Sequence, residues 1–342
     1  MRFRDPCLSV VEGGAPPGPS LGDPLLDRYL EFVAARARPN TVLAVRSDLR
    51  AFCAVVSKPL ADVSAVDVLG FIAAQRRPRG DGRVVRLADG EAGLSARTIK
   101  RRLSSVSGLF SYLVLIGEVE ANPVPRGLAT RRVRGRRGVA LVRTPHTLPK
   151  VLEPAEVDAL IAALRRWRDR AMVEAMVLGG LRRCEVLGLR LEDLRPGDRR
   201  VFVAEGKGGH QRLVPISARF FRTVSTYFER ERPSGTRTER VFVVLKGPRR
   251  GQPLADDGLD EIMRAARRRA GLAHASCHEL RHTCFTRLRE AGMALEAVQA
   301  QAGHRSIETT RLYVHLANDW LAAEYARVAE IIDAARPEAV AR

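Results

Sequence analysis

An arginine-rich, acid-free stretch near the middle of the chain constrains its fold most strongly. Residues 126–143 contain seven arginines, no aspartate or glutamate, several glycines and hardly any periodic spacing of apolar residues. Such a stretch has no hydrophobic face to bury, so it does not belong to a core. At 342 residues the chain is long enough for two domains of ordinary size. We therefore predict two domains joined by a basic linker over residues 126–148.

The part before the linker predicts an all-helical domain over residues 23–125. Residues 1–22 are rich in glycine and proline and predict a flexible tail. Apolar residues then recur at helical spacing, and Asn40 is the expected N-cap of a helix over residues 43–56. Ser95 is the expected N-cap of the last helix of this domain, which carries a cluster of basic residues in its first turns.

After the linker, the sequence pattern predicts helices together with a hairpin. We expect a second domain over residues 149–335, followed by a tail over residues 336–342. Two β-rich runs, 199–204 and 211–216, flank a glycine-rich segment and predict an antiparallel hairpin. Helical patterns surround this hairpin, and the last of them, beyond residue 318, has a strongly apolar face that needs a surface to cover. The second domain is therefore expected to be α+β.

The charge balance indicates the class of partner. The chain has 58 lysines and arginines against 39 aspartates and glutamates, a net charge of +19, and such a field attracts polyanions. It has no apolar run long enough for a membrane span and no apolar signal segment at the N-terminus, so we expect a cytoplasmic protein that binds nucleic acid and no membrane. The residues expected to contact DNA phosphates are Arg97, Lys100, Arg101, Arg102, Arg131, Arg132, Arg134, Arg136 and Arg137.

The five cysteines do not form a recognisable framework. They include no C-x-x-C pair, so neither a disulfide scaffold nor a four-cysteine zinc site is predicted. We expect them to be small core residues.

Residues 278–282 match the pattern H-E-x-x-H, in which two histidines one helical turn apart can bind zinc. Arg281 would place a fixed positive charge one turn from the metal, and no convincing third ligand follows, so we reject a zinc site. With a spacing of three residues, His278 and Arg281 put an imidazole and a guanidinium on one helix face, which suits an anionic oxygen centre.

Two more positively charged residues lie next to glycines, at predicted turns of the chain. Arg182 follows a pair of glycines between two predicted helices, and Lys207 lies between glycines at the tip of the predicted hairpin. Lysine is rare in this arginine-rich chain, with only five among the 58 basic residues. Each position alone has an ordinary structural explanation, but together they belong to a longer series.

The motif segments of that series are, in chain order, Gly180–Glu185, Gly206–Gly208, Arg212–Pro215, His278–Thr283, Gly303–His304 and Tyr313. Their order and spacing resemble the signature boxes of the tyrosine recombinase family, which includes phage integrases and Xer recombinases. The resemblance covers the second domain throughout and the first more loosely. Departures at Cys184, Cys284, Phe285 and Ala302 fall at packing positions.

The resemblance implies a fold that is mainly α with a small antiparallel β-sheet, made of an N-terminal helical, SAM-like core-binding domain and a C-terminal α+β catalytic domain with a terminal exchange helix. It implies a site-specific recombinase that cleaves and rejoins DNA through a covalent 3′-phosphotyrosine, without a metal or other cofactor. The implied catalytic residues are Arg182, Lys207, His278, Arg281, His304 and the nucleophile Tyr313, with Glu185 as a supporting residue.

Elementary chemistry agrees with these roles. A phenol can form the covalent phosphotyrosine, and the two forked guanidiniums can clamp the non-bridging phosphate oxygens as charge develops. One histidine can accept the phenolic proton, the other can donate to a phosphate oxygen, and the lysine can protonate the departing 5′-oxygen, which a permanently charged arginine cannot do.

The implied partners are double-stranded DNA sites, brought together by a homotetramer or by a heterotetramer with a related recombinase. Two alternatives remain open at this point. One is a type IB topoisomerase, which relaxes supercoils with a similar site. The other is a non-catalytic basic regulator, because residues 293–313 superficially resemble a helix-turn-helix. The regulator leaves Arg182 and Lys207 unexplained.

Overall fold

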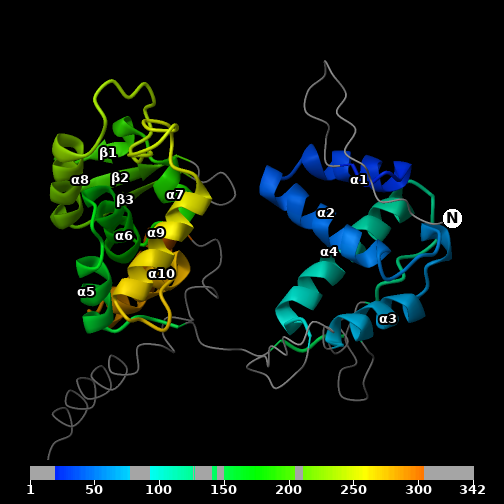
Figure 1. Ribbon diagram of the computed structural model, residues 1–342. Coiled ribbons are helices and arrows are strands. Elements are labelled where there is room, and N and C mark those ends of the chain that lie inside the picture. The colour runs from blue at the N-terminus through cyan, green and yellow to red at the C-terminus, as the bar shows by residue number, and fades with distance from the viewer. Residues whose placement is uncertain are drawn as a thin grey trace, which may run out of the picture. The chain divides into compact units, whose positions relative to one another are not determined.

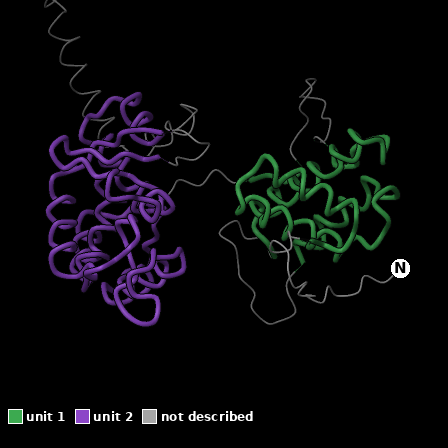
Figure 2. The backbone as a smooth tube through the Cα atoms, turned by 90° about the horizontal axis from the view of Figure 1, so that it is seen from above, with its two compact units in different colours: residues 1–146 green, residues 147–342 purple. Residues whose placement is uncertain are grey.

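The computed structural model describes residues 20–77, 93–125, 127, 141–144, 150–204 and 211–303. The chain divides into two compact units, residues 1–146 and residues 147–342 (Figure 2). Within the described ranges, none of the helices combines the length and the apolar character needed to cross a membrane.

The first unit is a group of helices (Figure 1), and buried apolar side chains form its core. Its described α-helices are α1 (Pro24–Ala34), α2 (Pro39–Cys53), α3 (Ala65–Arg76) and α4 (Ala96–Leu115). Phe52 of α2 lies edge-on to Phe71 of α3 and Phe110 of α4, with ring centroids 5.1 and 6.2 Å away. Edge-to-face contacts of this kind add to the area that the rings bury. Three of the four helices therefore meet at one buried residue.

The start of one helix agrees with the sequence and the start of another does not. The Ser95 hydroxyl accepts a hydrogen bond from the Thr98 backbone N–H at 3.2 Å, so the expected N-cap of α4 is confirmed. Asn40 is not an N-cap, because α2 begins at Pro39 and Arg38 is the capping residue. Proline suits the first helical position, where its ring presets φ and its missing N–H has no helical partner to lose.

The second unit packs helices around a central buried helix, beside a small sheet (Figure 1). Its described helices are α5 (Pro154–Ala162), α6 (Trp167–Gly179), α7 (Arg183–Gly188), α8 (Ala218–Arg230), α9 (Asp256–Arg269), α10 (Cys277–Glu290) and α11 (Leu295–Ala302). Almost every residue of α6 is buried, and α6 packs against both α8 and α10. The charged side chains buried along α6 are paired: Arg168 lies 2.7 Å from Asp169, and Glu174 lies 2.9 Å from Arg219 of α8.

The sheet has three antiparallel strands in the order β1 (Leu194–Arg195), β2 (Arg200–Val203) and β3 (Arg212–Pro215). Strands β2 and β3 form the predicted hairpin, with Val201 opposite Val214 in the core. Strand β1 was not predicted. The structure confirms the mainly helical class with a small antiparallel sheet.

Candidate active site

A glycine turn between α6 and α7 sets the position of Arg182. Helix α6 ends at Gly179, and its C-cap residue, Gly180, has a left-handed φ of 68°, a conformation that favours glycine. A Cβ on Gly180 would lie 2.5 Å from the Phe285 ring of α10. The turn therefore packs closely against α10, and Arg182, two residues after Gly180, is the N-cap of α7.

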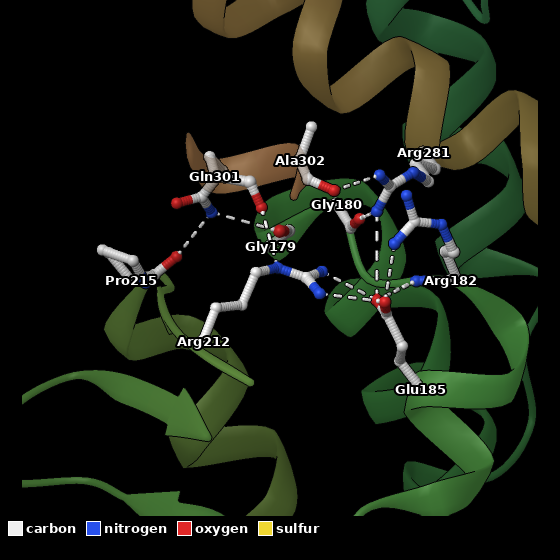
Figure 3. A network of polar contacts seen from close by, with 9 residues as sticks. All are labelled: Gly179, Gly180, Arg182, Glu185, Arg212, Pro215, Arg281, Gln301 and Ala302. Atoms are coloured by element: carbon white, nitrogen blue, oxygen red, sulfur yellow. Dashed lines mark hydrogen bonds and ion pairs between the residues drawn. The ribbon is translucent and has the colours of Figure 1, made fainter. Parts of the chain in front are cut away.

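The carboxylate of Glu185 gathers three arginines around itself (Figure 3). Arg182 donates through its backbone N–H at 2.9 Å and through Nη1 at 2.7 Å. Arg212 of β3 donates through Nη1 at 3.0 Å and Nη2 at 2.8 Å, in the forked geometry that arginine forms with carboxylates. Nη1 of Arg281 lies 3.9 Å from the same carboxylate. We call these four residues the arginine cluster.

The arginine cluster combines three positive charges with one buried negative charge. Burial by itself would raise the pKa of Glu185, but the hydrogen bonds and charge of Arg212, followed by those of Arg182, outweigh it and lower the pKa to about 2. The carboxylate therefore stays ionised and fixes the guanidiniums in place. A preorganised region of this kind can stabilise negative charge that develops on a phosphate during displacement.

The three arginines differ in exposure. The Arg182 side chain is 21% exposed, whereas that of Arg281 is 4% exposed. Arg281 donates to the carbonyls of Gly180 and, at 2.7 Å, of Ala302, and its guanidinium lies 4.7 Å from the centroid of the Phe285 ring. Arg281 therefore joins α10 to the glycine turn and to the end of α11, and Arg182 presents the more accessible charge.

His278 and His282 lie one turn apart at the start of α10 and contact each other directly. Their Nε2 atoms are 2.8 Å apart, so one donates a hydrogen bond and the other accepts it. Burial, followed by the nearby charges of His278 and Arg281, lowers the pKa of His282 to about 4. Over the described part of the chain, no group of three or more histidine, cysteine, aspartate or glutamate residues could hold a metal ion.

Comparison with known proteins identifies the family. Residues 150–319 match the phage integrase family, and residues 26–117 match the N-terminal SAM-like domain of phage integrases. The chain is 32% identical over 254 residues to a tyrosine recombinase XerC of Vibrio atlanticus, which covers 72% of this chain and 74% of the relative. It is 30% identical over 292 residues to a tyrosine recombinase XerC of Roseiflexus castenholzii, with 81% and 83% covered. The chain belongs to the tyrosine recombinase family.

Solved structures show the same fold. The site-specific recombinase XerH in a post-cleavage complex superposes with a TM-score of 0.63 at 23% identity, covering 88% of this chain and 84% of that one. The protein is thus a site-specific tyrosine recombinase, an enzyme that cleaves and rejoins DNA. The regulator and topoisomerase alternatives are not favoured by these matches.

The structure describes only part of the expected recombinase site. It brings Arg182, Arg281 and Glu185 together, and it places His278 one turn before Arg281 on α10. The other expected catalytic residues, Lys207, His304 and Tyr313, lie outside the described residues.

The expected DNA-contacting residues on α4 separate into two kinds. Arg97 and Lys100 are exposed. Arg101 is also exposed but pairs with the buried Asp48 at 2.7 Å, and Arg102 donates to Gln75 at 3.1 Å. These last two side chains therefore also hold helices of the first unit together. The remaining candidates, Arg131, Arg132, Arg134, Arg136 and Arg137, lie outside the described residues.

The described cysteines, Cys53, Cys184, Cys277 and Cys284, are free thiols. Cys284 is buried, as expected, but Cys184 is exposed, so the prediction that it is a core residue was wrong. It lies in the first turn of the short helix α7, whose buried residues are Glu185 and Val186.

Sequence reasoning missed Arg212 and Gln301. Arg212 was part of a motif segment but received no role, although a charged residue inside a β-rich run next to a candidate catalytic lysine was an available signal. Gln301 gave no signal, because a lone glutamine near the end of a helix is an ordinary surface residue. In the structure it is buried and makes two hydrogen bonds.

Proposed function

We propose that this recombinase cleaves DNA by direct attack of Tyr313 on a phosphodiester held by Arg182 and Arg281 of the arginine cluster. The observation that carries the proposal is the convergence of Arg182, Arg212 and Arg281 on one buried carboxylate. Such a cluster keeps its guanidiniums in fixed positions before any substrate binds, and charge stabilisation works best when no rearrangement is needed during the reaction.

In the proposed step, the phenolic oxygen of Tyr313 forms a bond to phosphorus while the bond from phosphorus to the 5′-oxygen breaks. His278 accepts the phenolic proton, and Lys207 gives a proton to the departing 5′-oxygen. The products are a 3′-phosphotyrosine and a free 5′-hydroxyl. Attack by a 5′-hydroxyl from a partner strand reverses the step and rejoins the DNA.

Arginines and histidine share the stabilisation of the phosphate in this scheme. Arg182 and Arg281 face the non-bridging oxygens, and His304 donates a further hydrogen bond. Loss of one such donor typically slows an acyl or phosphoryl transfer by about 100- to 1000-fold. Side chains fill every charge-neutralising role, so the scheme requires no metal.

We further propose that the substrate is a pair of double-stranded DNA sites held by four protomers. The net charge of +19 and the exposed Arg97 and Lys100 of the first unit support contact with DNA phosphates. The similar XerH structure contains a palindromic DNA substrate, and two-fold symmetric DNA matches two protein copies per site. Exchange between two such sites then needs four nucleophiles.

Tyr313→Phe tests the proposed chemistry. The full-length variant should bind DNA with unchanged affinity and form no covalent complex, because only the phenolic oxygen is removed. A nicked duplex that traps the phosphotyrosine, resolved on a denaturing gel in the presence of EDTA, measures the attachment. Tyr227→Phe is the matched control, because the hydroxyl of Tyr227 is buried and donates to the Val241 carbonyl.

Covalent attachment by the Tyr313→Phe variant would overturn the assignment of the nucleophile. Attachment that appeared only after zinc was added in place of EDTA would instead reopen the interpretation of His278 and His282 as zinc ligands.

A further inference from the structure

The C-terminal end of α11 is held by side chains from other parts of the chain. The last carbonyls of a helix have no donor within the helix and carry the negative end of its dipole. Here Nε of Arg212 donates to the Gln301 carbonyl at 3.3 Å, and Nη2 of Arg281 donates to the Ala302 carbonyl at 2.7 Å. Two successive carbonyls are thus bound by two guanidiniums of the arginine cluster.

The Gln301 side chain adds a second connection. Its Nε2 donates to the Gly179 carbonyl at 3.1 Å and to the Pro215 carbonyl at 2.9 Å (Figure 3). A carboxamide NH₂ has two hydrogens, so both are used, and the side chain is 8% exposed. One amide therefore ties α11 to the end of α6 and to the end of β3.

Arg212 connects the same elements from the other side. Its two Nη atoms bind Glu185 of α7, its Nε binds α11, and its side chain packs against Gly303. A Cβ on Gly303 would lie 3.1 to 3.3 Å from Cδ, Nε and Cζ of Arg212. Gly303 has a left-handed φ of 60°, so both its conformation and its close contact with Arg212 favour glycine.

These contacts involve the chain segments that lead to the proposed catalytic residues. The turn at Gly179 is followed by Arg182, Gly303 is followed by His304, and β3 follows the connection that contains Lys207. We propose that Arg212 and Gln301 are positioning residues, which fix the end of α11, the glycine turn and β3 relative to one another so that these three catalytic groups meet at one phosphate. This inference rests on the roles proposed above for those groups.

A positioning role differs measurably from a general contribution to stability. Misplacing a reacting group by about 1 Å can slow a reaction roughly 100-fold while substrate affinity is retained. A residue that only supports the fold would instead lower the amount of folded protein, and cleavage would fall in proportion. The two roles are therefore separated by measuring the cleavage rate of the bound complex beside the DNA affinity and the amount of folded protein. A positioning variant loses only the cleavage rate, whereas a purely structural variant loses cleavage in proportion to folded protein.

Gln301→Met removes both amide hydrogens and keeps the length of the side chain. In the full-length protein, with nicked duplex DNA in saturating amounts, we expect the single-turnover rate of covalent attachment to fall about 10- to 100-fold. DNA affinity should stay within about twofold and the melting temperature within about 5 °C. Arg212→Lys, which keeps the charge but loses the fork, should behave in the same way.

Arg219→Lys is the matched control, because Arg219 binds the buried carboxylate of Glu174 at 2.9 Å outside the arginine cluster. It should cleave at the wild-type rate. A substrate with a 5′-bridging sulfur, which leaves without protonation, adds a readout that stability does not affect. If Arg212 positions Lys207 through β3, this substrate should restore part of the rate lost in Arg212→Lys.

Wild-type rates in both variants would overturn the inference, as would losses that match the losses of folded protein or DNA affinity. Variants that failed to fold would also count against it, because the contacts would then serve the fold as a whole. Wild-type protein that formed no Tyr313-linked complex in the same assay would overturn the proposed function, and this inference with it. Normal wild-type attachment with normal Gln301→Met attachment would overturn the positioning role alone.

Discussion

Glu185 is the residue on which the arginine cluster depends, because its buried carboxylate is the common partner of three guanidiniums. Glu185→Gln keeps the shape of the side chain but removes its charge. We expect a loss of about 3 kcal/mol in the free energy of unfolding, because buried cations would be left without their counter-charge. Urea unfolding measures this loss. Cleavage of DNA should fall as well, since Arg182 would lose its anchor.

The pH dependence of stability gives a second readout of the same variant. The pKa of Glu185 is about 2 in the folded protein against an ordinary value of 4.5. Its stabilisation is therefore fully present above about pH 4.5 and is lost as the pH falls through about 2. Wild-type protein should lose stability more steeply over this range than Glu185→Gln. Equal slopes would contradict the role of the carboxylate.

Glu174→Gln is the control for Glu185→Gln, because the Glu174 carboxylate is also buried and binds Arg219 away from the arginine cluster. It should lose stability and keep its cleavage rate per folded molecule. Equal losses of cleavage in the two glutamine variants would show that the cluster has no special role.

At the scale of secondary-structure elements, the turn from α6 to α7 determines where the arginines lie. Gly180→Ala would force a side chain into a left-handed conformation and against the Phe285 ring. Together these effects should cost about 3 kcal/mol. Chemical denaturation measures this, and single-turnover cleavage should fall because Arg182 follows the turn directly.

Gly235→Ala separates the cost of the left-handed conformation from the cost of the steric overlap with the Phe285 ring. Gly235 also has a left-handed φ, of 74°, but a Cβ there would meet no atom within 4 Å, so only about 1 kcal/mol is expected. Adding Phe285→Leu to Gly180→Ala should recover part of the lost stability by relieving the steric overlap. Equal costs for the two alanine variants would disprove the contact between the turn and α10.

At the scale of the whole molecule, the two units have separate cores. Phe52 is buried in the core of the first unit, and Phe242 is buried in that of the second. Phe52→Ala should cost about 4 kcal/mol, and in the full-length protein hydrogen exchange should increase in α1 to α4 only. Phe242→Ala should have the reverse pattern, in α5 to α10. Increased exchange in both units from either variant would show that they unfold together.

Local patterns were sufficient to predict most helices. Ala218–Arg230 and the Ser95 cap follow from i, i+3 and i, i+4 spacing and from side-chain capping, which involve residues close in sequence. The two-residue strand β1 could not be predicted in this way, because it is a strand only through its pairing with β2. The start of α2 was misplaced because Asn40 and Pro39 offered competing signals.

The sequence by itself determined the two-part organisation, the helical character, the positive charge and the order of the motif segments that identify a tyrosine recombinase. Only the tertiary structure decided which of those residues share a site. Arg212 meets Glu185 from 27 residues away, Arg281 meets Gly180 from 101, and Gln301 meets Gly179 from 122. No periodicity or spacing encodes such contacts, because they depend on how α6, α7, α10, α11 and β3 pack together.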